Sequence, residues 1–142
     1  ECYEVTDKTL KIVFEQLKHF NVLLEGIVLK PNMVISGLDC NEQADVETVS
    51  EMTVKCLKSN VPEAVPGIAF LSGGQTSDLA TEHLNCMNKN HMESMPWNLT
   101  FSYGRALQAD ALKGWGGNNR ELGQENLIKR AEENSLATEG NI

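Results

Sequence analysis

Three short and almost continuously apolar runs restrict the fold of this chain more than any other feature. They cover residues 22–29, 68–71 and 99–103, and segments with helical patterning separate them. Such runs are typical of buried parallel strands, which need a crossover of a dozen or more residues, usually a helix, between them. The alternation therefore predicts an α/β fold in which helices cover at least one face of a parallel sheet.

Helical patterning precedes the first run and follows each of the three. In the first helix, predicted from residue 6 to about 19, apolar side chains recur at i, i+3, i+4 and i+7: Leu10, Val13, Phe14 and Leu17. Thr6 is a residue type that caps helix N-termini, so we place the start of this helix there. Four more helices are expected over residues 44–60, 77–89, 106–113 and 120–138, with a loop over 31–43. The last residues, 137–142, are expected to fray.

The charge of the chain excludes several classes of partner. Its 142 residues carry a net charge of −8, and no run of Lys and Arg exceeds two residues. Nucleic acids and anionic membrane surfaces attract basic patches, so we expect neither as a partner. No apolar stretch approaches the ~20 residues that span a bilayer. With 41% hydrophobic and 23% charged residues, the composition is that of one globular domain.

The four cysteines, at positions 2, 40, 56 and 86, form no CxxC pair and do not cluster with the histidines. A structural zinc site needs such spacing, and a disulfide framework is typical of smaller, secreted chains, so we expect neither. Reduced thiols in a cytoplasmic protein are the resulting expectation. His83 and His91 lie in or after a predicted helix and are expected at the surface.

The residues that follow the three strands carry the candidate chemistry, because parallel α/β proteins place their sites at the carboxyl ends of strands. The first strand is followed by Lys30. The second ends in a turn of small residues, and the third in a turn with a guanidinium: Ser72, Gly73 and Gly74, then Ser102, Gly104 and Arg105. We expect all of them on one rim of the sheet.

The two turns have the features of an anion site. Glycines let backbone N–H groups approach an anion, the N-terminus of the following helix adds a favourable dipole, and Arg105 can clamp a phosphate. Two successive strands that end in this way resemble the phosphate site of a barrel, built from the loops after its last two strands. Ordinary glycine turns and a surface arginine in an ion pair are the alternative interpretation.

Lys30 also has two interpretations. A lysine at the end of an apolar strand often extends its ammonium to water and marks only the end of the strand. An amine at the edge of a core and near an arginine can instead lose proton affinity, and a neutral amine attacks carbonyls to form a Schiff base. Spacing alone leaves both interpretations open.

Four blocks of this sequence resemble one family. "LLEGIVLKPNMV", "GIAFLSGGQ", "NLTFSYGRALQADALKGWGG" and "RAEENSLA" are similar, in order and spacing, to the C-terminal part of class I fructose-bisphosphate aldolases over residues 5–136. The resemblance implies an eight-stranded βα (TIM) barrel. Residues 1–142 would then form a partial barrel, approximately strands six to eight with their helices and the helix before strand six.

The resemblance also implies roles for the rim residues. Lys30 would form the Schiff base with dihydroxyacetone phosphate, in the reversible cleavage of fructose 1,6-bisphosphate to that ketone and glyceraldehyde 3-phosphate. The two turns, with Ser72, Gly73, Gly74, Ser102, Gly104 and Arg105, would bind a substrate phosphate. Neither a metal nor a cofactor is implied. The expected partners are the sugar phosphate and further copies of the chain, a tetramer in many relatives.

The family's acid/base carboxylates and its second lysine come from earlier strands that this chain does not contain. The chain also starts without Met, close to a helix, so we expect a fragment of a functional aldolase that is inactive alone. The alternative is a truncated product that binds a sugar phosphate or a partner chain without turnover. Another Schiff-base aldolase or a transaldolase is disfavoured by the "SGGQ" and "SYGRALQ" blocks.

Overall fold

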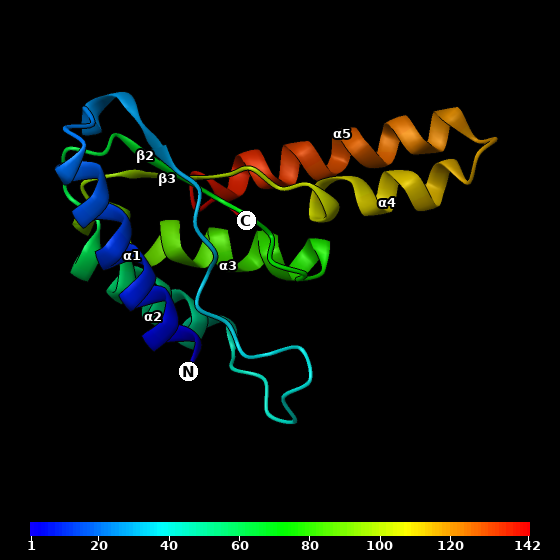
Figure 1. The fold of residues 1–142 in the computed structure, drawn as a ribbon. Helices are drawn as coiled ribbons and strands as arrows, with labels where there is room; N and C mark the ends of the chain where they lie inside the picture. Colours follow the sequence, from blue (N-terminus) through cyan, green and yellow to red (C-terminus); the bar gives the residue numbers. More distant parts are fainter.

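A computed structural model describes residues 1–142 and contains a parallel sheet with five α-helices (Figure 1). The elements follow one another in the order α1 (Cys2–His19), η1 (Leu24–Gly26), β1 (Val28–Leu29), α2 (Val46–Asn60), β2 (Gly67–Phe70), α3 (Ser77–His91), η2 (Met92–Ser94), β3 (Asn98–Phe101), α4 (Arg105–Trp115) and α5 (Arg120–Ala137), where η marks a 3-10 helix. The predicted alternation of strands and helices is confirmed.

The strands form one sheet in the order β1-β2-β3, and both pairs are parallel. Leu29 pairs with Ile68, which pairs with Leu99 on its other side. Each crossover contains a helix, α2 between the first two strands and α3 between the last two. The predicted parallel α/β arrangement is therefore confirmed.

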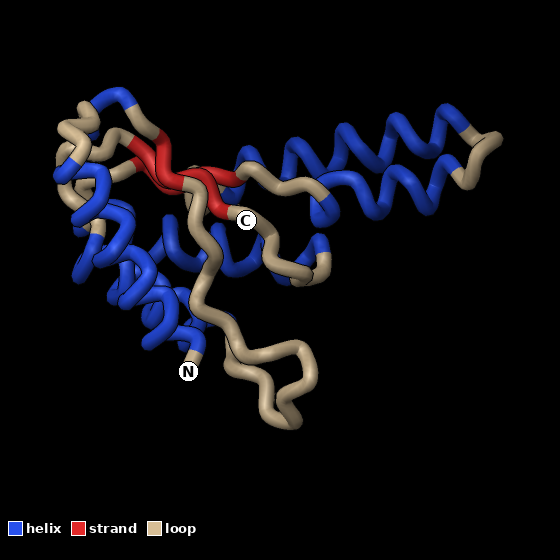
Figure 2. The backbone as a smooth tube through the Cα atoms, viewed as in Figure 1, coloured by secondary structure: helices blue, strands red, loops and turns tan.

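The helices α1, α2 and α3 lie on one side of the sheet, as Figure 2 shows. Ile68, Phe70 and Leu99 point into this helical layer and are 0%, 0% and 3% exposed. Because successive side chains of a strand alternate between faces, Val28 belongs to the opposite face, and it is 62% exposed. No helix covers that second face, so the sheet is half-covered.

The helices α4 and α5 form an antiparallel hairpin that extends away from the sheet (Figure 1). The glycines at its turn have left-handed backbones, with φ of 52° at Gly116 and 86° at Gly117. None of the helices combines the length and apolar character needed to cross a membrane.

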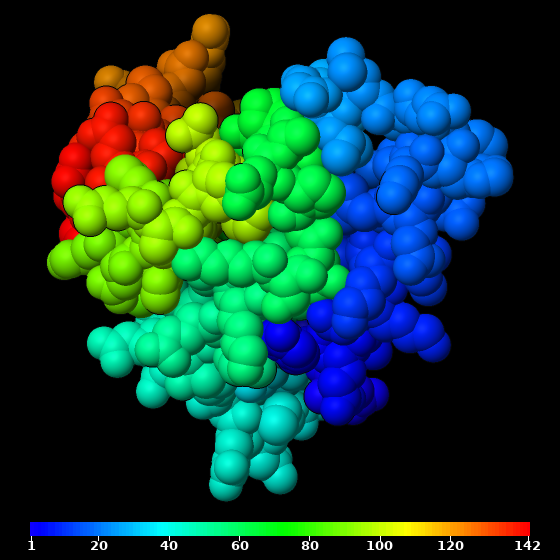
Figure 3. Space-filling view, turned by 90° about the vertical axis from the view of Figure 1, so that its left-hand side faces the viewer, coloured from blue at the N-terminus to red at the C-terminus, as the bar shows by residue number.

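The loop between β1 and α2 has no helix or strand, in agreement with the predicted loop. Figure 3 shows this loop (cyan) protruding from the body of the molecule. Asp45 ends the loop and caps α2, because its carboxylate accepts a hydrogen bond from the Thr48 amide at 2.7 Å.

The first strand is much shorter than the predicted strand over residues 22–29. Only Val28 and Leu29 pair with β2, and η1 occupies part of the apolar run. Asn21 adopts a left-handed conformation (φ 52°), which turns the chain directly after α1. The apolar run alone does not show where the strand begins, because only two of its residues have a partner strand to pair with.

The predicted N-cap at Thr6 is wrong, because α1 begins at Cys2. Thr6 is 7% exposed, and its hydroxyl accepts a hydrogen bond from the Asn32 side chain at 2.9 Å. The Thr6 hydroxyl therefore bonds to a side chain of the loop after β1, and not to a backbone N–H at the start of a helix.

The last residues, for which we expect a frayed end over 137–142, contact α3 in the structure. The backbone N–H and C=O of Ile142 both bond to the Asn85 side chain, at 3.1 and 2.9 Å. Gly140 (φ 69°) lies so close to α3 that a β-carbon there would come within 2.8 Å of the Lys89 backbone. Contacts with a distant helix, invisible to local pattern, hold these residues.

Candidate functional site

The carboxyl ends of the three strands meet at one edge of the sheet. Beyond β1 the pairing continues, because the Leu71 amide donates to the Pro31 carbonyl at 3.0 Å. Beyond β3 the Ser102 amide donates to the Phe70 carbonyl at 2.8 Å. Lys30, the turn that starts at Ser72, and Ser102 are therefore neighbours across adjacent strands.

Lys30 follows Leu29 directly, so its side chain belongs to the sheet face that no helix covers. The residue is exposed, and its ammonium takes part in no ion pair. Pro31, which is buried, follows it and lacks the N–H that would extend the ladder. The lysine therefore stands free at the rim, beside the ends of β2 and β3.

The turn after β2 has a conformation that needs glycine. Gly73 and Gly74 have φ of 59° and 83°, and side chains other than glycine rarely adopt such backbones. The N–H groups of both residues donate to no group of the protein. Thr76 then caps α3, accepting a hydrogen bond from the Leu79 amide at 3.3 Å. The turn thus presents free backbone donors beside a helix N-terminus.

The turn after β3 leads into α4, which starts at Arg105 and has no side-chain cap. A β-carbon on Gly74 would lie 4.0 Å from Nη2 of Arg105, so the guanidinium reaches the preceding turn. A hollow of about 140 Å³ lies between the starts of α3 and α4, lined by Gly74, Gln75, Thr76, Ser77, Arg105, Ala106 and Ala109. Free N–H groups and a guanidinium around a small hollow can bind an anion.

A buried pair holds the turn after β2 from beneath. Gln75 is 9% exposed, and both its backbone and its side-chain N–H groups donate to the Ser72 carbonyl, at 3.0 and 2.9 Å. Its side-chain oxygen lies 2.6 Å from Nδ1 of His83. Since this oxygen can only accept, Nδ1 of His83 carries the proton and donates it.

The expectation of a surface position for His83 is wrong, since the residue is 2% exposed. Burial lowers the pKa of His83 to about 4, and its Nε2 has no hydrogen-bond partner. The contribution of Gln75 and His83 was missed because nothing in the local pattern separates a buried helical histidine from an exposed one. The final Gln of the "SGGQ" block was the only signal.

Tyr103 anchors the turn after β3 in a similar way. It is 6% exposed, and its hydroxyl donates to the Ala80 carbonyl of α3 at 2.9 Å. Burial raises the pKa of this phenol, so it stays protonated as a donor. The anchor leaves the neighbouring Ser102, Gly104 and Arg105 exposed.

The structure thus gathers the predicted residues unevenly. Gly74 and Arg105 meet across the hollow, whereas Ser72 is buried and its carbonyl is occupied by Gln75. Lys30 does not line the hollow; it directly follows β1, which pairs with β2. No group of three or more His, Cys, Asp or Glu is placed to hold a metal ion, and all four cysteines are free thiols.

Comparison with known proteins gives one consistent result. The family model "Fructose-bisphosphate aldolase class-I" matches residues 1–142. A "Probable fructose-bisphosphate aldolase class 1" from Xanthomonas campestris is 53% identical and covers 98% of this chain. Fructose-bisphosphate aldolase A from Salmo salar is 49% identical and covers 96% of the chain.

A solved structure has the same fold. The fructose-bisphosphate aldolase of Plasmodium falciparum, in a ternary complex with TRAP and a small-molecule inhibitor, superposes with a TM-score of 0.92 at 47% identity over 99% of this chain. The chain spans 42% of the Xanthomonas protein, 38% of the Salmo protein and 40% of the Plasmodium chain. It therefore corresponds to about two-fifths of these relatives.

Proposed function

This chain belongs to the class I fructose-bisphosphate aldolase family, and from that premise we propose that it supplies the Schiff-base lysine and one phosphate clamp of such an aldolase. The complete enzyme would cleave fructose 1,6-bisphosphate reversibly to dihydroxyacetone phosphate and glyceraldehyde 3-phosphate. The approach of Arg105 to the Gly74 turn, at the strand ends that also carry Lys30, is the observation that carries the proposal.

Lys30 is the nucleophile in this proposal. Its neutral amine attacks the keto carbon of the substrate, and loss of water leaves an iminium. A base from the remaining strands takes the proton of the C4 hydroxyl; the carbon–carbon bond then breaks, its electron pair moves into the iminium to form an enamine, and the aldehyde product leaves. Protonation of the enamine and hydrolysis of the resulting iminium release the ketone and restore Lys30. The open face of the sheet gives the substrate access to this amine.

The phosphate clamp holds the substrate beside Lys30. The free N–H groups of Gly73 and Gly74, the uncapped start of α4 and the Arg105 guanidinium are the donors that would bind its oxygens. Ser102 and Gly104 lie beside them at the end of β3. Ser72 would support the clamp by holding the turn in place, because its carbonyl accepts both N–H bonds of Gln75. Tethering raises the effective concentration of the carbonyl at the amine.

We further propose that β1, β2 and β3 are strands six, seven and eight of a (βα)8 barrel, and that the bare sheet face lines its interior. The open edges of β1 and β3 would pair with the remaining strands. Those strands would carry the acid/base carboxylates and the second lysine. Cytoplasmic location and assembly into a tetramer are part of the same proposal.

Reductive trapping tests the nucleophile. The full-length protein that contains this chain is incubated with dihydroxyacetone phosphate and borohydride, digested, and analysed by mass spectrometry. We expect a stable adduct on the peptide with Lys30, its loss in Lys30→Met and its retention in Lys8→Met, which removes an exposed lysine of α1. A trapped adduct on another lysine, or none, would refute the role of Lys30.

A second function is favoured for the 142-residue chain when it stands alone. It has the clamp and the lysine, whereas the proton-transfer residues of the family belong to earlier strands. We therefore propose that the isolated chain binds a sugar phosphate without cleaving it. Calorimetry with dihydroxyacetone phosphate, paired with an aldol-cleavage assay, separates the two: binding without turnover supports this function, and turnover contradicts it.

A further inference from the structure

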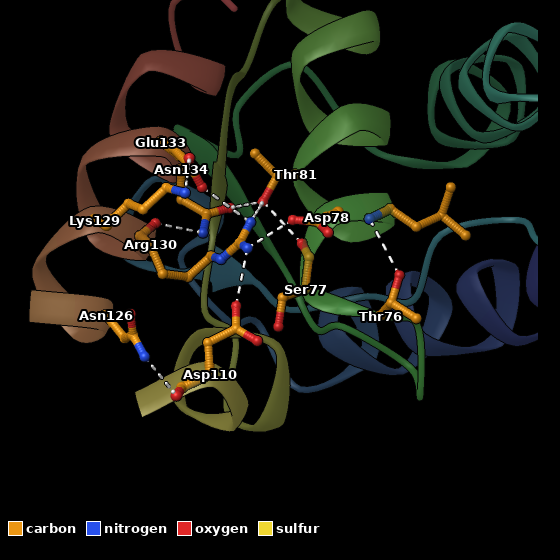
Figure 4. Close-up of polar contacts among 11 residues, drawn as sticks. Thr76, Ser77, Asp78, Thr81, Asp110, Asn126, Lys129, Arg130, Glu133 and Asn134 are labelled. Atoms are coloured by element: carbon orange, nitrogen blue, oxygen red, sulfur yellow. Dashed lines mark hydrogen bonds and ion pairs between the residues drawn. The ribbon is translucent and has the colours of Figure 1, made fainter. Parts of the chain in front are cut away.

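A buried arginine joins the two helices whose starts line the hollow (Figure 4). Arg130, in α5, has a side chain that is 8% exposed. Its Nη2 lies 2.6 Å from Oδ1 of Asp78 and 2.9 Å from Oδ2 of Asp110, and its Nη1 lies 3.1 Å from Oε2 of Glu133. One nitrogen therefore bonds to carboxylates of two different helices, α3 and α4.

The positions of the two carboxylates connect this arginine to the phosphate clamp. Asp78 lies in the first turn of α3, directly after the residues of α3 and its cap that line the hollow. Asp110 lies on α4, next to Ala109, which also lines the hollow, and on the helix that Arg105 begins. A shift of either helix would move one half of the clamp against the other.

Arg130 lies in a row of three polar side chains on α5. Asn126, Arg130 and Asn134 recur every four residues and form one polar stripe. The Asn126 amide donates only to the Asp110 carbonyl of α4 (3.0 Å), and Asn134 accepts from the Thr81 hydroxyl of α3 (3.0 Å). Of the three, Arg130 alone bonds to side chains of both helices. Because α4 projects away from the sheet with α5 (Figure 1), this stripe, together with the Tyr103 anchor, holds α4 against α3.

The pairing of Asp78 with Arg130 also favours the binding of an anion. Asp78 is 79% exposed and stands beside a hollow that would receive an anion. An unpaired carboxylate there would repel a phosphate and compete for the start of α3. The guanidinium of Arg130 bonds to Asp78 at 2.6 Å and offsets part of its charge, although it also pairs with Asp110 and Glu133. Its planar fork holds both aspartates in fixed directions, which a lysine ammonium cannot do.

We infer that Arg130 is a positioning residue for the phosphate clamp, setting the distance between the Gly74 turn and Arg105 and offsetting the charge of Asp78. It touches no substrate in this arrangement. The inference rests on the proposed function, since it concerns the anion that the clamp would bind.

The test measures binding of inorganic phosphate to the full-length protein by ³¹P NMR, at a temperature where each variant is folded. We expect Arg130→Met to weaken phosphate binding by about tenfold to 100-fold. Arg130→Lys should lose less, because it keeps the charge but not the fork. Arg120→Met is the matched control, since Arg120 is an exposed arginine of the same helix, outside the Arg130 cluster, and the affinity of this variant should equal that of the wild type.

Two readouts separate positioning from a purely structural role. Adding Asp78→Asn to Arg130→Met should restore part of the affinity, because it removes the unpaired carboxylate, although it restores no packing. Hydrogen exchange of Arg130→Lys should quicken in residues 72–76 and 103–107 and stay unchanged in α1 and β2. A uniform increase in exchange, or no rescue by Asp78→Asn, would overturn the inference.

The outcomes also distinguish this inference from the proposed function. If wild-type binding depends on Arg105 but Arg130→Met and Arg130→Lys bind phosphate equally well, Arg130 has no positioning role and the clamp stands. If Arg105→Ala binds phosphate as tightly as the wild type does, the clamp itself is refuted and the inference with it. If Arg130→Met does not fold, Arg130→Lys supplies the affinity and exchange measurements that decide the question.

Discussion

Replacing Gly74 by alanine should destabilise the protein through backbone strain alone. Gly74 has φ of 83°, beyond the left-handed region that other residues occupy at φ of about 50° to 70°. The added β-carbon would meet Cδ1 of Leu38 at 3.4 Å and Nη2 of Arg105 at 4.0 Å, which are ordinary contacts with mobile side-chain ends. The expected cost therefore comes from φ and not from a steric clash.

The size of the effect follows from two opposing contributions. A non-glycine residue in a left-handed conformation costs about 1–2 kcal/mol, and the φ of Gly74 favours the upper end. Alanine also restricts the unfolded chain, which returns about 0.4–1 kcal/mol. The net loss is about 1 kcal/mol, or a decrease in Tm of roughly 3–5 °C for a domain of this size.

Gly37→Ala is the matched control for this prediction. Gly37 lies in the exposed loop before α2, its φ is not positive, and an added β-carbon meets nothing within 4 Å. The unfolded-state term then acts alone, so the free energy of unfolding should stay equal or rise by up to about 1 kcal/mol. Urea unfolding of both variants measures the difference. If Gly74→Ala proves as stable as Gly37→Ala, the assigned backbone conformation is wrong.

Three further predictions address other parts of the molecule. Burial lowers the pKa of His83 from 6.5 to about 4, so the fold favours its neutral form. His83 should therefore leave the free energy of unfolding unchanged above pH 6.5 and lower it by about 3 kcal/mol in all as the pH drops towards 4. Urea unfolding of His83→Gln should lose this pH dependence. Burial also raises the pKa of Cys56 to about 11, so a thiol reagent at pH 8 should modify the exposed Cys40 first and Cys56 only on unfolding; early modification of Cys56 would contradict this. Asn85→Ala removes both hydrogen bonds to Ile142, so hydrogen exchange in residues 138–142 should quicken while that of β2 stays unchanged; equal exchange in both variants would show that other contacts hold this segment.

The order of helices and strands could be predicted from local pattern, because the apolar runs and helical periodicities are properties of neighbouring residues. The parallel pairing followed from the crossover lengths, and the common edge of the strand ends followed from the pairing. Gly73 and Gly74 could be placed in the turn because few other residues adopt the backbone that it needs. The family blocks imply a chemical role for Lys30 that spacing alone left open.

The tertiary structure decided everything that depends on a partner far along the chain. Thr6 resembles a cap in its local sequence, but its hydroxyl binds Asn32, 26 residues away. Arg130 pairs locally with Glu133, but nothing in its local sequence indicates its two other carboxylates, Asp78 and Asp110, which lie 52 and 20 residues before it. Periodicity reports which face of an element is apolar, whereas ion pairs and buried hydrogen bonds form only after packing brings distant polar groups within about 3 Å. Local sequence therefore defines the elements and the edge that bears the site, and packing defines the distances within it.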